Sequence, residues 1–538
     1  MEAKLLNKQD IKEILQARFA NDTHTTLSQL PLPSELKDCY KAAHRIKEAI
    51  EKNEKIAVVG DYDVDGVVSS AILADFLSLV GADFVVKIPN RFKDGYGLSV
   101  EIIEELKGVD LIITVDNGIT ANEAAQRARE LGICLIITDH HMPSQTLPTA
   151  YAIINPKQPE CTFDAAEICG AQVAWYIVGA LKEVCGVSVD MKCYLDLLSV
   201  AIVADMMELR GMNRALVRSG FKRLNSSKRP CFEAMKLCLN KTKFEFDDIS
   251  YLLAPLINSA GRMNDASVSF DFLRAKSLRE ATELFEQIRS FNNSRKSEER
   301  ELFSQLNERI CSDKSYAKDA VLVLWGEGWH EGILGVLASR VTKRFNKPSI
   351  IFSIDGDRAK GSARGVGHFD MLGLITQMQE HLIAFGGHKG AAGVTIAPEK
   401  LQMFRELINA SALVKELEVI HRNEDILGQI NVSVIDNELL SIFDEFEPYG
   451  QKNPRPFFEV KDAKVINIRS IGLENKHLKI LFKQGYKMFE AMFFNYDYLP
   501  RVGEVLNLEI SISKNFFGGV LRPQIVIHKL EKGEENAK

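Results

Sequence analysis

The stretch Lys55-Ile56-Ala57-Val58-Val59-Gly60-Asp61-Tyr62-Asp63-Val64-Asp65-Gly66 decides the fold. Its first half is a short apolar run, and its second half carries three aspartates within five residues. Because apolar residues at helical spacing precede it over 35–51, the apolar run is predicted to be a buried strand that turns into a further helix. Three carboxylates in one turn repel one another unless cations neutralise them, and helix capping uses only one. The stretch therefore predicts a strand end and a metal site at the same place.

The same alternation of short apolar runs and helix-like segments continues along the chain. The predicted strands are 84–88, 111–115, 134–138 and 151–154, and the predicted helices between them are 68–80, 100–106 and 121–131. Strands that are apolar throughout and alternate with helices indicate a parallel sheet covered on both faces. We predict a doubly wound α/β domain over 45–230, after an N-terminal helical segment over 1–44.

Two further units are predicted downstream. A long charged helix over 277–310 has a thin apolar stripe and is typical of a solvated connecting helix, within a helical region over 231–317. The stripe consists of Leu284, Ile288, Phe291, Leu302 and Leu306. A second α/β domain over 318–415 is predicted from the strand 320–324, the helix 332–345, the strand 349–352 and a glycine-rich stretch that ends at 395.

The pattern changes to short alternating strands in the last part of the chain. These are 458–466, 478–482, 487–494, 505–512 and 523–527. Five such strands indicate a small OB-like barrel, here over 430–535. Residues 449–530 contain thirteen Lys and Arg against seven Asp and Glu, and they carry the aromatic residues Tyr449, Phe457, Phe458, Tyr486, Phe516 and Phe517. Such a surface suits single-strand binding, although we expect most of these aromatic residues to belong to the barrel core.

Composition excludes several classes of protein. The 538 residues carry a net charge of -6, so any nucleic-acid-binding surface has to be local. Nine cysteines without a CxxC pair support neither a disulfide framework nor a cysteine-rich zinc site. No apolar signal region opens the sequence, and no apolar run approaches the ~18 residues that a membrane helix needs. We expect a cytoplasmic protein without membrane contact.

Polar residues follow two more of the predicted strands. Asp116-Asn117-Gly118 follows 111–115, and Asp139-His140-His141 follows 134–138. The carboxyl ends of parallel strands share one edge of a sheet, so these side chains should meet those of Asp63 and Asp65. Asp205, at the end of an apolar helix-like run, is a further candidate. Carboxylates with imidazole favour Mn2+ or Mg2+. Two such ions ~3.5 to 4 Å apart suit hydrolysis of a phosphate ester or anhydride.

These motifs resemble those of the DHH phosphoesterase superfamily, and a glycine-rich stretch resembles the signature of its DHHA1 partner domain. That stretch is Gly386-Gly387-His388-Lys389-Gly390-Ala391-Ala392-Gly393. Within the superfamily, four more motifs are similar to those of the RecJ family of single-strand-specific exonucleases, in family order. They are Asn90-Arg91-Phe92-Lys93-Asp94-Gly95-Tyr96-Gly97, Asn258-Ser259-Ala260-Gly261-Arg262-Met263, Ser362-Ala363-Arg364 and Pro448-Tyr449-Gly450-Gln451-Lys452-Asn453-Pro454.

The resemblance implies a role for each matching residue. Asp63 and Asp65 would each hold one metal ion, Asp116 would bridge the two, and His140 and Asp205 would complete the second site. His141 would face the scissile phosphate, Asp61 would be a ligand or support one, and His388 would lie at the same cleft. Arg91, Arg262, Ser362 and Arg364 would contact the terminal phosphate of DNA, with Gly387 allowing close backbone approach.

The function expected from this resemblance is a metal-dependent exonuclease that degrades single-stranded DNA from 5′ to 3′ into nucleotides, in DNA repair and recombination. Expected partners are single-stranded DNA, a single-stranded DNA-binding protein and repair helicases, and the expected state is a monomer. Two alternatives stay open at this point. One is an oligonucleotide or nucleotide phosphatase of the same superfamily, and the other is a non-catalytic DNA-binding relative.

Overall fold

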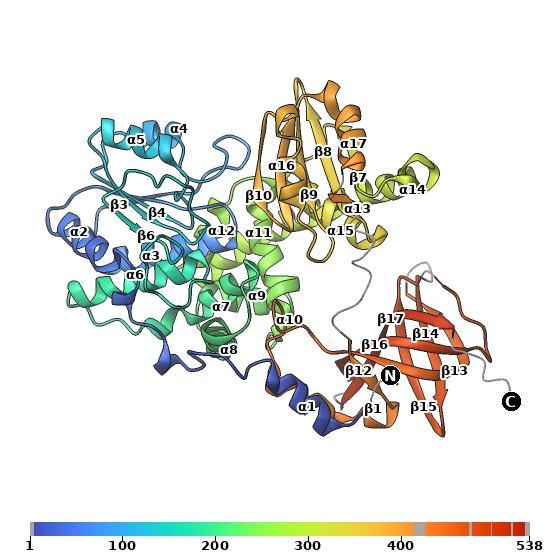
Figure 1. The fold of residues 1–538 in the computed structure, drawn as a ribbon. Helices are drawn as coiled ribbons and strands as arrows, with labels where there is room; N and C mark the ends of the chain where they lie inside the picture. Colours follow the sequence, from blue (N-terminus) through green and yellow to red (C-terminus); the bar gives the residue numbers. More distant parts are fainter. Residues whose placement is uncertain are drawn as a thin grey trace.

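The structure is a computed structural model that describes residues 5–411, 413–414, 426–472, 476–496, 498–517 and 520–532. Its first sheet is wholly parallel and has the strand order β3-β2-β4-β5-β6. The strands are β2 (Ile56–Val59), β3 (Phe84–Lys87), β4 (Leu111–Val115), β5 (Cys134–Thr138) and β6 (Ala152–Ile154). All five predicted strands of this sheet are therefore present, and Figure 1 shows the sheet edge-on among its helices.

Helices cover both faces of this sheet, which confirms the doubly wound fold. Alternate side chains of β2 explain the arrangement: Ile56 and Val58 are buried in one core, and Ala57 and Val59 in another. The first core contains α2 (Cys39–Glu51), α3 (Val64–Leu79) and α6 (Gly170–Val184). The second contains α4 (Val100–Glu105) and α5 (Asn122–Glu130). One strand thus supplies apolar side chains to both helical layers.

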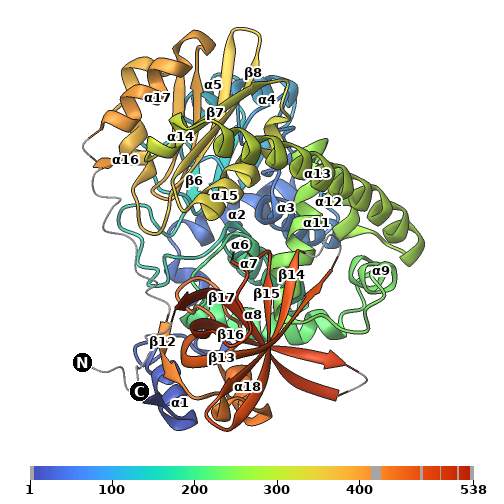
Figure 2. The ribbon, with the colours of Figure 1, turned by 90° about the vertical axis from the view of Figure 1, so that its right-hand side faces the viewer.

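A helical region follows the first sheet and ends in a long helix. Its helices are α7 (Leu195–Ala204), α8 (Gly211–Ser226), α9 (Pro230–Cys238), α10 (Phe246–Asp248), the π-helical turn Ile249–Leu253, α11 (Ala254–Met263), α12 (Ser267–Arg274) and α13 (Leu278–Ser312). Figure 2 shows α13 running beside α11 and α12 toward the second α/β unit. The predicted stripe of α13 was partly wrong, because Phe285 rather than Leu284 is fully buried and the stripe continues through Asn292, Arg295 and Glu299.

The second α/β unit is a mixed sheet with the order β10-β11-β9-β8-β7. Its strands are β7 (Leu322–Glu327), β8 (Ser349–Asp355), β9 (Arg358–Arg364), β10 (Ala384–His388) and β11 (Ala391–Ile396). Its helices are α14 (Ser315–Lys318), α15 (Leu334–Phe345), α16 (Met371–Thr376) and α17 (Leu401–Ala410). Only β7 and β8 pair in parallel. The glycine-rich stretch forms the antiparallel hairpin of β10 and β11.

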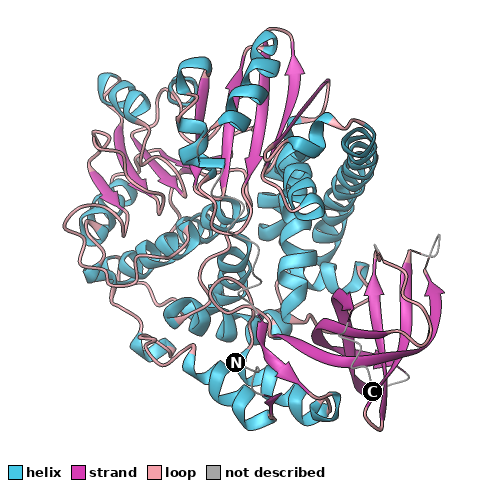
Figure 3. Ribbon diagram, turned by 45° about the vertical axis from the view of Figure 1, so that its right-hand side comes forward, coloured by secondary structure: helices cyan, strands magenta, loops and turns pink. Residues whose placement is uncertain are grey.

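The C-terminal strands close into a five-stranded barrel, as predicted (Figure 3). They are β13 (Phe457–Ile471), β14 (His477–Gln484), β15 (Lys487–Phe494), β16 (Val505–Phe517) and β17 (Val520–Lys532). The barrel runs β13-β14-β15-β17-β16 and returns to β13. Phe458 is a core residue and Tyr486 is fully exposed. The side chains of Phe516 and Phe517 lie outside the described residues.

The N-terminal segment packs on the barrel. Strand β1 (Leu5–Leu6) pairs in parallel with β12 (Ile426–Ile430), which itself pairs with β13. Helix α1 (Lys8–Ala17) packs against α18 (Asn437–Phe446), and its Ile11 and Leu15 are buried in the barrel core. Nothing in the sequence pattern predicted this pairing, because β1 is only two residues long. Within the described parts of the chain, no helix has the length and apolarity to cross a membrane.

Candidate metal centre and substrate cleft

Three aspartates lie where β2 ends and α3 begins. Asp63 is the N-cap of α3, and its Oδ1 accepts hydrogen bonds from the backbone N–H groups of Asp65 (2.8 Å) and Gly66 (3.1 Å). The sequence predicted that this helix begins near residue 68. Helix α3 instead begins at Val64, and Asp65 lies in its first turn. Asp61 is buried against Gly66, where an added Cβ would lie 2.6 Å from the Asp61 backbone. The aspartate motif 60–66 therefore forms both the turn after β2 and the N-terminus of α3.

Asp65 is held by a second helix. Its carboxylate accepts hydrogen bonds from the N–H groups of Gly170 (2.5 Å) and Ala171 (2.9 Å), at the start of α6. The partial positive charge of a helix N-terminus stabilises a carboxylate in this position. Gly170 also lies against Asp116, because a Cβ at this glycine would collide with the Asp116 carboxylate. The N-terminus of α6 thus packs against two predicted ligands.

Asp116 follows β4 in a left-handed conformation, with φ of 64°. This conformation is uncommon for a residue other than glycine and directs the side chain toward the neighbouring strand end. The next residue, Asn117, fixes the turn through its side chain, which donates to the carbonyls of Val59 (3.1 Å) and Val115 (2.9 Å). The turn after β4 is therefore tied directly to the end of β2.

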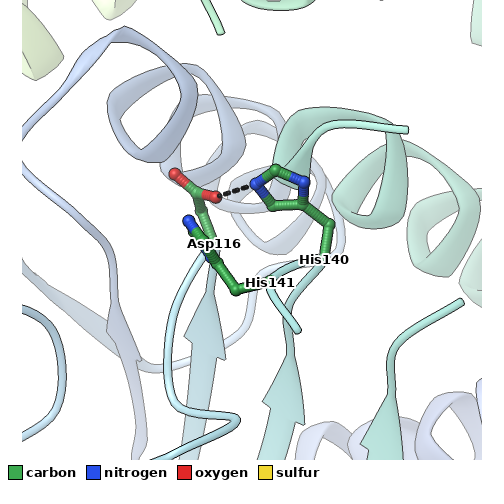
Figure 4. A group of neighbouring side chains, drawn as sticks. All are labelled: Asp116, His140 and His141. Atoms are coloured by element: carbon green, nitrogen blue, oxygen red, sulfur yellow. Dashed lines mark ion pairs between the residues drawn. The ribbon is translucent and has the colours of Figure 1, made fainter. Parts of the chain in front are cut away.

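Asp139, His140 and His141 follow β5. His140 Nε2 lies 3.2 Å from Asp116 Oδ1, the pair drawn in Figure 4, 3.5 Å from Asp205 Oδ2 and 3.8 Å from Asp65 Oδ2. Asp205 follows α7, so side chains after three strands and one helix meet at one point. The convergence predicted from the parallel sheet is present.

Asp139 does not join that cluster. Its Oδ1 accepts hydrogen bonds from His141 Nδ1 (2.8 Å) and from the N–H groups of His140 (2.7 Å) and His141 (3.1 Å), and its Oδ2 accepts one from Ile119 (2.9 Å). Asp139 therefore orients both histidines. Sequence reasoning assigned no role to this first residue of the motif.

The electrostatics of the cluster call for cations. Burial, followed by the charges of its aspartate neighbours, raises the pKa of Asp205 to about 9 and that of Asp116 well above its usual range. Burial lowers the pKa of His140 to about 4, so this ring is neutral and can offer a nitrogen lone pair. Among the described residues, Asp61 Oδ1, Asp116 Oδ1, Asp205 Oδ2 and both ring nitrogens of His140 are buried without a hydrogen-bond partner. Buried atoms of this kind are rare unless they bind something.

Donor atoms in this cluster lie close enough together to share metal ions. Three groups of side chains each bring their donor atoms within 4.8 Å of one another. They are Asp61, Asp63 and Asp116; Asp65, His140 and Asp205; and Asp116, His140 and His141. Asp116 belongs to two groups, which is what a bridging carboxylate requires. Carboxylate and imidazole donors without a thiolate fit Mn2+ or Mg2+.

A cleft of about 510 Å³ opens beside this cluster, between the two α/β units. Arg91, Ser362, Arg364 and Gly387 line it, as do Tyr62 and Tyr96. Burial, followed by the charge of Arg91, lowers the pKa of Arg364. Two guanidinium groups that face one open space favour an anion between them.

His388 and Arg262 complete the set of predicted residues. The ring of His388 lies parallel to that of His141, with 6.3 Å between their centroids, so the second α/β unit reaches the metal cluster. Arg262 Nη1 donates to the Gly332 carbonyl over 3.4 Å, and the residue lines a second cavity of about 540 Å³ on the barrel side. Burial, then Arg91 and Arg295, lowers the pKa of Arg262 to about 10.

Comparisons with known proteins agree with this geometry. Three family models match: the DHH family N-terminal domain over 55–202, the DHHA1 domain over 318–412 and the RecJ OB domain over 426–529. The single-stranded-DNA-specific exonuclease RecJ of Escherichia coli (strain K12) is 31% identical over 522 residues, which cover 91% of this chain and 89% of that protein. The chain belongs to the RecJ family. The RecJ of Bacillus subtilis (strain 168) is 32% identical over 98% of this chain and 67% of its own length.

Solved RecJ structures are similar as well. The structure of RecJ from Thermus thermophilus in complex with Mn2+ superposes with a TM-score of 0.81 at 25% identity, over 99% of this chain and 80% of that one. A structure of exonuclease RecJ bound to manganese gives a TM-score of 0.62 at 30% identity, over 71% of this chain and 97% of that one. Divalent metal binding by RecJ proteins agrees with the donor set found here.

Besides Asp139, two tyrosines of this RecJ-family site had no role in the sequence prediction. The ring of Tyr96 lies edge-on to His141 at 6.1 Å and to Tyr62 at 6.2 Å, and the Arg91 guanidinium lies over Tyr62 at 5.3 Å. Both tyrosines stand inside motifs that the sequence had singled out. Their positions in these motifs are the sequence feature from which a contact with the site could be predicted.

Proposed function

We propose that this protein is a metal-dependent exonuclease that hydrolyses single-stranded DNA from its 5′ end into nucleotides. The observation that carries the proposal is the cluster of buried, unpartnered carboxylate and imidazole atoms beside a cleft lined by Arg91 and Arg364. The cluster suits divalent ions, and the cleft suits the phosphates of a strand. The family's curated members, including that of E. coli, carry the name single-stranded-DNA-specific exonuclease.

In this proposal, Asp63 and Asp65 would each hold one ion, Asp116 would bridge the two, and His140 and Asp205 would complete the second site. The distances from His140 Nε2 to Asp116 and Asp205 support the shared second site. Asp61 lies next to the first site. Bound there, the ions would neutralise the carboxylates, activate water and stabilise the negative charge that develops on the phosphoryl and departing oxygens.

His141 is the acid and positioning group of the chain itself. Burial alone would lower its pKa, but the hydrogen bond and charge of Asp139, together with Asp205 and Asp65, raise the pKa to about 9. Because Nδ1–H donates to Asp139, Nε2–H is left to donate to a phosphoryl oxygen or to the departing oxygen. His388, with its pKa lowered by burial and by His141, packs over the first ring as a neutral imidazole.

The cleft supports the proposal that a terminal phosphate of the strand is bound, which we take to be that of the 5′ end. Arg364 Nη1 donates to Ser362 Oγ over 3.2 Å, and Gly335 lets the start of α15 approach both side chains, because a Cβ there would lie 2.8 Å from Arg364 Nη2. A terminal phosphate at Ser362 and Arg364 would place the next phosphate near the metal cluster. The strand would then pass the second cavity, with Arg262 and Arg295, toward the barrel.

The barrel would hold the downstream strand through its exposed β14–β15 turn. Lys483, Tyr486 and Lys487 are exposed there, so cationic and aromatic groups are available to phosphates and bases.

The domain division 45–230, 231–317, 318–415 and 430–535 belongs to this proposal: two catalytic units, a connecting region and a strand-binding barrel. So do the cytoplasmic location, the monomeric state, the role in repair and recombination, and recruitment by a single-stranded DNA-binding protein and repair helicases.

One digestion tests the proposal. Single- and double-stranded 40-mers labelled at either end are incubated with purified protein and Mn2+, and with EDTA as a control. We expect mononucleotides from the 5′ end of the single strand and no product with EDTA. Faster cleavage of a dinucleotide than of the 40-mer would instead support the phosphatase, and binding without cleavage would support a non-catalytic relative.

A further inference from the structure

The predicted metal ligands differ in how firmly the protein holds them. Asp63 accepts two backbone N–H groups within its own helix turn, and Asp65 accepts two from the start of α6. Asp205 follows the last turn of α7, and its Oδ2 has no hydrogen-bond partner among the described residues. Its carboxylate position therefore depends on the backbone that carries it.

That backbone leaves the helix abruptly. Met206 has a φ of 55°, in the left-handed region. Residues other than glycine adopt this backbone conformation at a cost that the surrounding structure has to offset. The residues that follow, 206–211, form the exit segment. Apart from the backbone hydrogen bonds of α7 and α8, its backbone has three anchors among the described residues, namely Leu209 N–H, the Glu208 carbonyl and Gly211 N–H. Two of these three anchors reach parts of the chain outside the first α/β unit.

The first outside anchor is Asp22, in the N-terminal segment that follows α1. Its carboxylate accepts hydrogen bonds from Gly211 N–H (2.7 Å) and from Arg210 Nε (2.8 Å) and Nη2 (2.6 Å). The Asp22 side chain is only 5% exposed, so these charge-assisted bonds are shielded from water. One carboxylate thus fixes both the backbone and a side chain of the exit segment.

The second outside anchor is the loop 448–454, which leads into the barrel. Its Gln451 carbonyl accepts a hydrogen bond from Leu209 N–H over 2.9 Å, and Gly450 lets the loop approach, because a Cβ there would lie 2.7 Å from Leu209 Cδ1. Asn453 is fully buried and holds the loop closed, donating to the carbonyls of Phe446 (2.9 Å) and Pro448 (2.7 Å). This motif, singled out in the sequence, had no role in catalysis.

The two anchors are themselves connected. Arg18, four residues before Asp22, donates from Nη1 to Asn453 Oδ1 (3.2 Å) and to the Pro454 carbonyl (2.6 Å). Phe19 stacks on Phe446 at the end of α18, with 6.2 Å between ring centroids. The N-terminal segment and the barrel loop therefore act on the exit segment as one body, which we call the latch: residues 18–22 and 448–454.

We propose that the latch is a positioning device for the metal centre, in which Asp22 and Asn453 hold the exit segment so that Asp205 faces His140. The inference rests on the proposed function, because it takes Asp205 as a ligand. Docking of the barrel then has a second consequence besides strand binding: it orders a ligand whose Oδ2 has no hydrogen-bond partner among the described residues. Residues that orient ligands in this way typically change metal affinity by about 10- to 100-fold when they are replaced.

The test measures metal binding directly, by electron paramagnetic resonance of free Mn2+ in titrations of the full-length protein. Asp22→Ala removes one anchor, and Asn453→Asp removes both hydrogen bonds that close the loop. We expect each to raise the dissociation constant of the weaker Mn2+ site about tenfold. Lys8→Ala is the matched control: Lys8 also ties the N-terminal segment to the C-terminal part of the chain, through Asp436 Oδ2 at 2.6 Å, but neither residue belongs to the latch. Its Mn2+ affinity should stay within about twofold of the parent.

A second readout separates positioning from simple stability. Thermal melting followed by circular dichroism shows whether each variant is folded at the titration temperature, and if Asn453→Asp is not, Asp22→Ala decides. Wild-type Mn2+ affinity in folded Asp22→Ala would overturn the inference. Asp205→Ala tells this failure apart from failure of the proposed function. Weakened binding in Asp205→Ala with normal binding in Asp22→Ala rejects the latch alone, whereas normal binding in Asp205→Ala rejects the ligand assignment itself.

Discussion

Replacing Asp139 by Asn should make hydrolysis strongly dependent on pH. Burial lowers the pKa of His141, and the hydrogen bond and charge of Asp139, followed by the charges of Asp205 and Asp65, raise it to about 9. If the pKa returns to its ordinary value near 6.5, the protonated fraction at pH 8 falls from about 0.9 to about 0.03, a loss of roughly 30-fold. At pH 6 the same change lowers that fraction only from nearly 1 to about 0.8. The defect should therefore grow with pH, and lost orientation of the ring adds a factor that pH does not change.

The assay is the initial rate of nucleotide release from a 5′-phosphorylated 40-mer at saturating Mn2+, from pH 6 to pH 9. Asp110→Asn is the matched control, since the Asp110 carboxylate also accepts a backbone hydrogen bond, from Lys55 at 2.8 Å, but lies at the opposite end of the same sheet. The control should follow the parent at every pH. A variant at Asp139 that loses the same factor at pH 6 and pH 8 would refute the acid role of His141, and a loss below about threefold at pH 8 would refute its importance.

Three further predictions concern single sites. Asp116→Ala should abolish hydrolysis while leaving the dissociation constant for single-stranded DNA nearly unchanged in a filter-binding assay; near-normal turnover would exclude the bridging role. Arg364→Ala should remove the preference for 5′-phosphate over 5′-hydroxyl ends, a loss of about 1.5 to 3 kcal/mol, seen in kcat/KM for the two substrates. Arg358→Ala, exposed on the same strand β9, should keep that preference. Glu447→Gln should stabilise the protein at pH 8 but not at pH 4. Burial raises the pKa of Glu447 to about 7, so the folded state holds a proton that the unfolded state releases, and stability falls as pH rises from about 4.5 to 7. The full shift corresponds to about 3 kcal/mol, and solvent screening at this partly exposed site reduces it to about 1 to 2 kcal/mol; equal melting temperatures of the two proteins at pH 8 would contradict this.

Local pattern was enough for most of the sheet and barrel strands. The strands β2, β4 and β5 are buried apolar runs, and a parallel sheet brings their ends to one edge whatever the loops do. For this reason the meeting of Asp65, Asp116 and His140 could be predicted without any contact information. The barrel strands could be predicted because each alternates between core and solvent.

The sequence pattern predicted helix starts and buried faces wrongly where polar residues cap a helix or are themselves buried. Helix α3 begins earlier than predicted because Asp63 caps it, although three aspartates suggested a turn. The buried stripe of α13 includes Arg295 and Glu299, which pair at 2.7 Å, and a search for apolar residues passes over such a pair. The anchoring of Asp205 depends on contacts between residues that are hundreds of positions apart in the chain, and no local signal records those contacts.

The pairing of β1 with β12 has a consequence for the order in which the protein is made. Leu5 and Leu6 join a ladder with Gln429 and Ile430, more than four hundred residues later. At roughly 5 to 20 residues per second, a ribosome needs about 20 to 80 seconds to synthesise the chain between them. Over that interval the apolar face of α1, with Ile11 and Leu15, has no core to enter, while both α/β units can already fold. The barrel and its added strands can therefore be completed only after both α/β units have been synthesised.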